Sequence, residues 1–302
     1  MRLFGWLRQT PSEQASAPAS AGLWRWFGGR RLLAQSLYVM PKDHLEGERL
    51  NLQHHLLRIA LGRNYYPRLR QPRAILDIAC GTGIWGLEMA QEFKKARVIC
   101  FDYDRTAFDS SMAKRGSEGL PANFEFQVHD ALQPFPFEEG SFDFTHLRFV
   151  GSFVSRDRWP GLVAEMARCT NRGGYVEVVE LEDLASPSPA YAQLKEVGKR
   201  LLEMRNLHQF PAPYIADYMR SAGIQQIQVK RVVLGEGRQK SREQRLLSAD
   251  TLAIWTNLQP IITKLGLVPE DTYRDLLGQL KEELPRMGVT MPILFTYGLR
   301  LD

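Results

Sequence analysis

The 302-residue sequence has no apolar run that reaches the roughly 18 residues needed to span a bilayer. Its first residues, MRLFGWLRQTPSE, contain too short an apolar stretch for a secretory signal peptide. Cysteine is scarce, and Cys80, Cys100 and Cys169 have neither metal-ligand spacing nor the pairing of a disulfide scaffold. These absences lead us to expect a cytoplasmic protein in a reducing compartment.

Acidic residues are missing from two basic stretches. Residues 58–73 contain five arginines and no acid, and residues 1–31 contain five arginines against Glu13 alone. Residues 230–245 are also basic, and the net charge is +5. No RNA-binding signature accompanies this charge, so we expect a solvated basic face rather than nucleic-acid binding. Aromatic residues alternate with arginines near the N-terminus, which leaves weak peripheral membrane contact as an alternative there.

The chain divides into three parts by composition. Residues 9–22 are rich in Pro, Ser and Ala without periodicity, which predicts a flexible tail over residues 1–22. Residues 23–66 are expected to form an N-terminal helical cap, with helical periodicity from Gly29 to about Leu61 and a stop at Gly62. His54 and His55 are adjacent, so they point to different faces of that helix; we expect one packed, one solvated and no metal site.

Residues 67–302 alternate between strand and helix patterns, which indicates an α/β fold. The expected strands are 74–79, 96–102, 124–130, 141–148, 175–180, 224–234 and 293–301. The expected helices are 84–93, 105–115, 157–170, 214–223, 248–265 and 270–286. The last two strands leave no room for a crossover, which predicts an antiparallel terminal strand. The fold class is thus a Rossmann-like, seven-stranded, mostly parallel sheet with lid insertions near 186–215 and 246–288.

The stretch ILDIACGTGIWGLEMA contains Gly81, Gly83 and Gly86, a literal G-x-G-x-x-G pattern that is followed by Asp102. This loop could hold a dinucleotide, but its acidic neighbours argue against a pyrophosphate. Asp77, Asp102 and Asp130 lie at the ends of three successive predicted strands. Three carboxylates suit a cationic adenosine cofactor better than an anionic one. We therefore predict S-adenosyl-L-methionine as the cofactor in place of NAD.

In order, the motifs LDIACGTGIW, CFDYD, HDA, GSFDFTHLR and TNRGGYVEVVE resemble class I S-adenosylmethionine-dependent methyltransferases. GRR at 29–31, Tyr38 with Pro41 and Asp43, and EGERLNLQHH at 46–55 resemble more specifically the LaeA-type (TAM domain) small-molecule methyltransferases. The sequence departs from the usual pattern at Cys80, at Trp85 and at 171–174, where Asn-Arg-Gly-Gly replaces Lys-Pro-Gly-Gly.

The resemblance implies a set of cofactor contacts. Asp77, Gly81 and Gly83, with Thr82 between them, would line the methionine end. Asp102 would bind the ribose, and Tyr103, Asp130 and Ala131 would frame the adenine. Tyr38 and the 46–55 helix would close over the cofactor as a cap. Arg148 is expected either at the bound ligands or paired with Glu46 or Glu48.

A sulfonium already makes the methyl group electrophilic, so the main task of such a protein is in-line placement of an acceptor. A base is needed only if the acceptor loses a proton, and the candidates are His146, His208 and Glu180. The lid residues are expected to form either an apolar acceptor wall or the lid's own core. The residues in question are Leu252, Trp255, Leu258, Met204, Phe210 and Tyr214.

The sequence-based hypothesis is therefore methyl transfer by SN2 displacement to a small, moderately hydrophobic acceptor, such as a polyketide, terpenoid, phenolic or alkaloid. Two alternatives remain at this stage. One is an RNA or protein methyltransferase, although no N-P-P-Y-like motif follows the fourth strand. The other is a regulator or a non-methylating enzyme, such as a cyclase, because fold does not dictate function.

Overall fold

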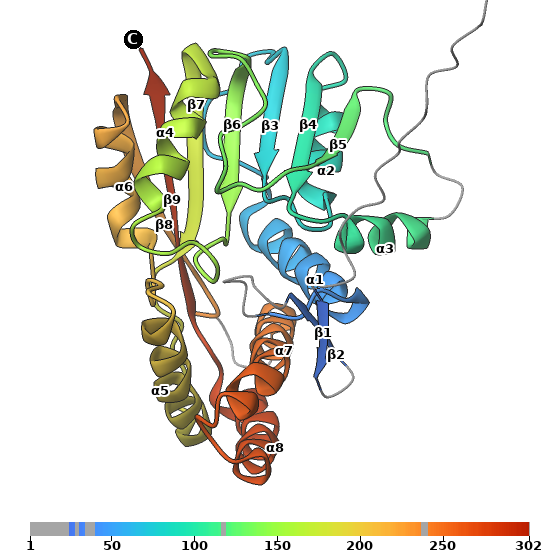
Figure 1. The fold of residues 1–302 in the computed structure, drawn as a ribbon, viewed down its shortest axis with the longest axis vertical. Helices are drawn as coiled ribbons and strands as arrows, with labels where there is room; N and C mark the ends of the chain where they lie inside the picture. The colour runs from blue at the N-terminus through green and yellow to red at the C-terminus, as the bar shows by residue number, and fades with distance from the viewer. Residues whose placement is uncertain (1–23, 28–29, 34–39, 116–118, 237–240, 302) are drawn as a thin grey trace, which may run out of the picture.

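The computed structural model describes residues 24–27, 30–33, 40–115, 119–236 and 241–301 (Figure 1). The predicted tail at 1–22 and the cap residue Tyr38 lie outside the described residues.

A seven-stranded sheet forms the centre of the molecule, in the order β5-β4-β3-β6-β7-β9-β8. The first five of these strands are parallel, and β9 is antiparallel to both of its neighbours, as the sequence predicts. The strands are β3 (Ala74–Ile78), β4 (Arg97–Asp102), β5 (Phe124–Val128), β6 (Phe142–Arg148), β7 (Thr170–Leu181), β8 (Ile224–Leu234) and β9 (Met291–Arg300).

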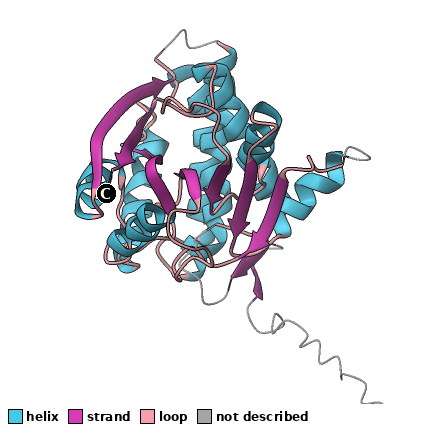
Figure 2. Ribbon diagram, turned by 90° about the horizontal axis from the view of Figure 1, so that it is seen from above, coloured by secondary structure: helices cyan, strands magenta, loops and turns pink. Residues whose placement is uncertain are grey.

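Helices cover both faces of this sheet (Figure 2). On one face lie α2 (Ile84–Glu92) and α3 (Thr106–Arg115), and on the other α4 (Trp159–Cys169) and α6 (Ala212–Ser221). Beyond the carboxyl ends of the parallel strands lie α1 (His44–Leu61), α5 (Pro189–Met204), α7 (Arg242–Lys264) and α8 (Glu270–Met287) (Figure 1). Among the helices described, none combines the length and apolar composition needed to cross a bilayer.

The helical pattern expected from Gly29 is wrong at its start. Strands β1 (Trp24–Phe27) and β2 (Arg30–Leu33) pair antiparallel, and α1 begins only after Asp43, whose side chain accepts a hydrogen bond from the Glu46 N–H. The missed signal was the Gly-Gly pair between the tetrapeptides WRWF and RRLL, which is typical of a two-residue hairpin. Two other expectations for α1 are confirmed: His54 is buried while His55 is exposed, and the helix stops at Gly62.

The lid contains one helix that the sequence analysis did not assign, α5. It begins with Ser188 as N-cap and Pro189 in its first turn, a start signal that is visible in the sequence. Together α5, α7 and α8 build a second hydrophobic core below the sheet. Tyr273 of α8 is fully buried there and donates its hydroxyl hydrogen to the Trp255 carbonyl at 2.8 Å.

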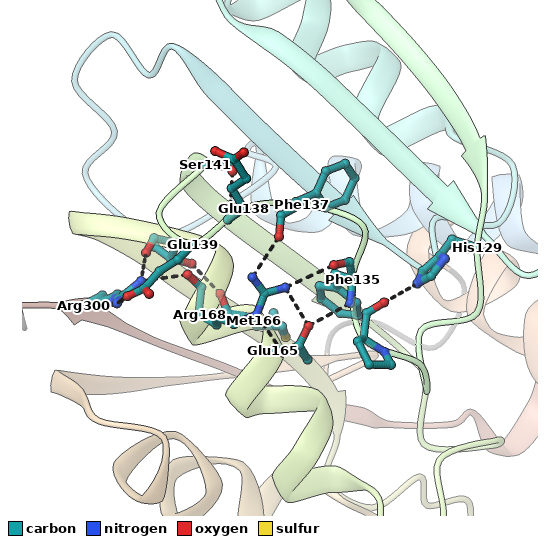
Figure 3. Close-up of polar contacts among 12 residues, drawn as sticks. His129, Phe135, Phe137, Glu138, Glu139, Ser141, Glu165, Met166, Arg168 and Arg300 are labelled. Atoms are coloured by element: carbon teal, nitrogen blue, oxygen red, sulfur yellow. Dashed lines mark hydrogen bonds and ion pairs between the residues drawn. The ribbon is translucent and has the colours of Figure 1, made fainter.

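A network around Arg168 fixes the loop that leads from β5 into β6 (Figure 3). Its guanidinium donates to the carbonyl oxygens of Phe137 at 2.8 Å and Phe135 at 3.1 Å and pairs with Glu165. The Glu165 carboxylate in turn accepts from the Phe135 N–H at 2.7 Å. This loop follows Asp130 directly, so the network also fixes the adenine end of the predicted site.

Strand register places a row of polar side chains across one face of the sheet. Cys100 of β4 lies in register with Asp77 of β3, and Asp77 lies in register with His146 of β6. His146 is in turn in register with Glu177 of β7. Residues in register share a face, and all four are almost completely buried. The ring of Trp85 stacks on His146 with centroids 3.8 Å apart and an interplanar angle of 4°.

Glu177 ends this row with an incompletely satisfied carboxylate. Its Oε1 accepts from the Tyr66 N–H at 2.9 Å, while Oε2 lies 4.0 Å from His146 Nε2 and has no hydrogen-bond partner among the described residues. Burial raises the pKa of Glu177 to about 8, against the lowering by that backbone bond and by Arg148. The folded protein therefore keeps a proton that the unfolded chain loses above about pH 4.3.

We expect Glu177→Gln to raise the melting temperature at pH 8 by about 2–4 °C, the shift that 1 kcal/mol produces in a domain of this size. The gain should be much smaller at pH 5. Between these values the unfolded wild type is deprotonated while folded Glu177 stays protonated, so wild-type stability falls as pH rises. Differential scanning fluorimetry at both pH values measures this, with exposed Glu203→Gln as control. An equal gain at the two pH values would contradict the assignment.

Helix α2 approaches β4 so closely that only glycine fits at position 86. A Cβ there would lie 2.1 Å from Cys100 Sγ. We expect Gly86→Ala to lower the free energy of unfolding by about 1–3 kcal/mol through overpacking. Gly278→Ala in exposed α8, where a Cβ meets nothing within 4 Å, should instead stabilise by up to about 1 kcal/mol. Urea titration distinguishes the two, and equal effects would refute the close contact.

Candidate functional site

A cavity of about 370 Å³ lies at the carboxyl ends of β3, β4 and β6, where open α/β sheets bind ligands. The predicted site residues from four separate segments converge on it. Those that line the cavity are Asp77, Gly81, Thr82, Asp102, Tyr103, Asp130, Ala131, His146 and Arg148. Of the remaining predictions, Gly83 does not line it and Tyr38 is outside the described residues.

The glycine loop turns sharply between β3 and α2. Gly81 and Gly83 both have left-handed backbone conformations, with φ of 59° and 72°. The Gly81 N–H donates to Asp102 Oδ2 at 2.9 Å, and the Thr82 hydroxyl donates to Asn51 Oδ1 at 2.7 Å. Gly83 faces the other way, because a Cβ there would lie 2.9 Å from the ring of Phe108. Gly83 therefore serves the turn and helix packing rather than the cavity wall.

Asp102 carries an ion pair that sequence reasoning missed. Lys42 Nζ lies 3.0 Å from Asp102 Oδ1 and 3.3 Å from Asp104 Oδ2. Burial alone would raise the pKa of Asp104, but Lys42 and the Thr106 N–H bring it below its usual value. A ribose that binds Asp102 has to share or displace the Lys42 ammonium. Nothing in the sequence around Lys42 indicated this ion pair, since Lys42 and Asp102 are 60 residues apart in the chain.

His146 is placed to orient Asp77. Its Nδ1 lies 2.9 Å from Asp77 Oδ1, and a carboxylate only accepts, so Nδ1 carries the proton. Nε2 faces Glu177 across 4.0 Å. Burial lowers the pKa of His146 although Asp77 opposes this. Both ring nitrogens thus point at carboxylates within the sheet, and neither is free to take a proton from a methyl acceptor. This geometry favours a positioning role for His146 over the predicted role as a base.

Arg148 is half-buried and contacts His54 of the cap helix rather than the predicted carboxylates Glu46 and Glu48 of the same helix. Its Nη2 lies 3.3 Å from His54 Nδ1, and His54 Nε2 lies 3.0 Å from Glu88 Oε1. Burial alone would raise the pKa of Glu88, but hydrogen bonds with His54 and Asn64 lower it to about 2. The alternative that paired Arg148 with Glu46 or Glu48 is wrong: those carboxylates bond elsewhere.

Glu46 belongs to a buried polar cluster that joins α1 to the lid. Arg49 pairs with Glu46 at 2.7 Å and with Asp250 of α7 at 2.9 Å. Asn257, also on α7, donates to Glu46 Oε2. Burial raises the pKa of Asp250, against the lowering by Arg49. The cap helix and the lid are therefore connected by charge as well as by apolar packing, at the rim of the cavity.

A second cavity of about 230 Å³ lies between α1, α5, α7 and the end of β7. Leu50, Gln53 and Phe149 line both cavities, so the two spaces adjoin. Part of the predicted apolar wall is found here. Its members Phe210, Trp255 and Leu258 line the second cavity, whereas Leu252 packs against the lid core and Met204 and Tyr214 are exposed.

Two of the three base candidates, Glu180 and His208, line this second cavity. Glu180 is 2% exposed, and its Oε1 accepts from the N–H groups of Val150 at 2.6 Å and Gly151 at 3.1 Å. Burial raises its pKa to about 8, although these backbone donors oppose the shift. His208 Nε2 lies 3.0 Å from the Tyr218 hydroxyl, and burial followed by Arg156 lowers its pKa.

Phe149, at the junction of the two cavities, has a strained backbone. Its φ is 57°, in the left-handed region that bulky residues rarely occupy. The Phe149 N–H donates to the Val179 carbonyl at 3.0 Å, and Glu180 binds the next two N–H groups. Such strain persists where surrounding contacts over-determine it, which is common at functional sites.

Comparisons with known proteins agree with this geometry. Residues 75–174 match the family described as methyltransferase domain. The chain is 31% identical to the secondary metabolism regulator LAE1 of Cochliobolus heterostrophus, over 52% of this chain and 49% of that protein. It is 24% identical to the N-methyltransferase gliN of Aspergillus fumigatus, over 87% and 96%. The chain spans about half the length of LAE1 and a smaller share, 39%, of another curated relative.

Among solved structures, phosphoethanolamine N-methyltransferase 2 of Haemonchus contortus superposes with a TM-score of 0.50. It is 18% identical, over 83% of this chain and 53% of that one, which supports the Rossmann-like fold. The glycine loop, the strand-end acids and the domain match thus agree. Residues 75–174 match a methyltransferase domain, as the motifs in this stretch predict.

Proposed function

We propose that the protein transfers the methyl group of S-adenosylmethionine to a small, moderately hydrophobic acceptor by in-line displacement. One observation carries the proposal: the cavity lined by the strand-end acids adjoins a largely apolar cavity at Phe149. A cofactor in the first space and an acceptor in the second would meet at their junction. In-line displacement requires that the acceptor atom approach the methyl carbon from the side opposite the sulfur.

The proposed placement of S-adenosylmethionine in the first cavity follows from the charges around that cavity. Asp102 and Tyr103 would take the ribose and stack on the adenine, and Asp130 would accept from the adenine amino group. Asp77, fixed by His146, would face the methionine end, where the ammonium and sulfonium carry positive charge. When bound, the cofactor supplies an activated methyl group, so the chain's own work is to orient both partners and exclude water.

The small volume of the second cavity, about 230 Å³, supports a small molecule rather than a macromolecule as acceptor. Its wall is largely apolar and comes from the lid helices and the cap helix. The name of gliN, which aligns over nearly its whole length, includes methylation at nitrogen. The name of LAE1, a regulator, supports a second possibility in which the cofactor fold serves regulation. Turnover on an acceptor distinguishes the two.

The first test is calorimetric titration with S-adenosylmethionine, S-adenosylhomocysteine and NAD. We expect micromolar binding of the first two, weakened about 10- to 100-fold in Asp102→Ala, since charge-assisted hydrogen bonds are lost. Exposed Asp109→Ala on α3 is the matched control and should bind like wild type. Melting curves establish that both variants fold. Binding of NAD alone would refute the proposed cofactor and with it the proposed function.

A further inference from the structure

The carboxylate of Glu180 forms part of the wall of the second cavity. Glu180 is the only acidic residue that lines it among the described residues. The N–H groups of Val150 and Gly151 both donate to Oε1, which leaves Oε2 for a ligand. The Leu181 N–H is a third backbone group that favours the ionised carboxylate. Gly151 makes room for it, because a Cβ there would lie 3.3 Å from Oε2 and 2.8 Å from Pro211.

The location of this carboxylate matters as much as its isolation. Val150 and Gly151, which bind it, directly follow Phe149, one of the residues that line both cavities. Glu180 therefore lies beside the junction where an acceptor atom would meet the methyl group. His146, in contrast, is enclosed in the polar row of the sheet and directs both nitrogens at carboxylates.

The cations near Glu180 are occupied by other acids or face solvent. Arg49 is paired with Glu46 and Asp250, Lys195 is paired with Asp183, and Lys199 is exposed. Two other titratable groups of the wall have partners elsewhere: His208 bonds the Tyr218 hydroxyl, and Tyr191 donates its hydroxyl hydrogen to the Leu184 carbonyl. A carboxylate buried without a counter-ion is costly, and a ligand that brings a positive N–H group removes that cost.

A second polar group in the wall also awaits a partner. Thr251 of α7 is fully buried, lines the second cavity, and its hydroxyl has no hydrogen-bond partner among the described residues. Buried hydroxyls are normally hydrogen-bonded, so an orphan in a cavity wall points to a ligand. The surrounding wall is aromatic and aliphatic, with Phe149, Phe210 and Trp255 among its members.

From these contacts we infer that the second cavity binds an apolar amine and that Glu180 accepts a proton from the amine nitrogen. This inference rests on the proposed function and names its acceptor class. The Glu180 carboxylate takes one proton from the ammonium, which frees the nitrogen lone pair. That pair forms the N–CH₃ bond while the S–CH₃ bond breaks and its electrons stay on sulfur. The products are a methylated ammonium, neutral S-adenosylhomocysteine and protonated Glu180, which releases its proton to solvent.

The amine should bind more tightly as pH rises, because the carboxylate form of Glu180 attracts the ammonium. With the pKa of Glu180 raised to about 8, its ionised fraction grows about 20-fold between pH 6.5 and pH 8.5. The other charged groups that face the cavity are Arg49 on α1 and Lys195 and Lys199 on α5, with His208 on the following loop. The arginine and the lysines stay cationic over this range, and protonation of His208 at low pH would only act in the same direction.

The experiment uses the full chain saturated with S-adenosylhomocysteine and size-matched probes: 2-phenylethylamine and tryptamine against 3-phenylpropionate. Binding is measured by calorimetry at pH 6.5 and 8.5 for wild type, Glu180→Gln and the exposed α5 control Glu196→Gln. The glutamine can still accept from the Val150 and Gly151 N–H groups, so the Phe149 turn keeps its contacts. We expect wild type and the control to bind the amines about 20-fold more tightly at pH 8.5, and not to bind the carboxylate.

In Glu180→Gln, amine affinity should fall at least about tenfold at pH 8.5 and lose its pH dependence, with S-adenosylhomocysteine binding unchanged. Labelled-methyl transfer to the amines should fall in parallel. Equal binding of amine and carboxylate, absence of amine binding, or an unaltered Glu180→Gln would each overturn the inference while the proposed function stands. Failure of wild type to bind S-adenosylhomocysteine would overturn the proposed function itself.

Discussion

The hydrogen bond between His146 and Asp77 is the contact on which the rest of the site depends. Strand register alone brings the two side chains to one face, and the stacked Trp85 ring seals them from water. Trp85 follows the glycine loop, so the same residue ties the start of α2 to the sheet. Asp77 is thereby held with a defined orientation at the edge where the loop, β4 and β6 meet.

The cap and the lid complete what the sheet begins. Helix α1 contributes Leu50 and Gln53 to both cavities and reaches α7 through the Arg49 ion pairs. Buried ion pairs add little net stability, but breaking one partner leaves an uncompensated charge. This cluster therefore specifies how the lid docks on α1, and the docked lid forms part of the wall of the second cavity.

The two glutamates Glu88 and Glu180 have opposite electrostatic surroundings. Glu88, with His54, Arg58 and Asn64 around it, has its pKa lowered to about 2, whereas unpaired Glu180 has its pKa raised to about 8. The difference comes from counter-charges, since burial raises the pKa of both. Groups whose pKa values are driven apart in this way can take different roles, one as a fixed charge and one as a proton acceptor.

Much of this protein follows from local patterns. Periodicity located all seven strands of the sheet, and it gave the bounds of Ile224–Leu234 to the residue. The three strand-end acids and the glycine loop, which were predicted to share one site, line a single cavity. Such acids converge because parallel strands end at one edge. Tertiary structure alone decided the pairing of Lys42 with Asp102, of Arg49 with Asp250 across 201 positions, and the place of Glu180 at the junction. These contacts depend on how separate elements dock, and no local spacing in the chain encodes that docking.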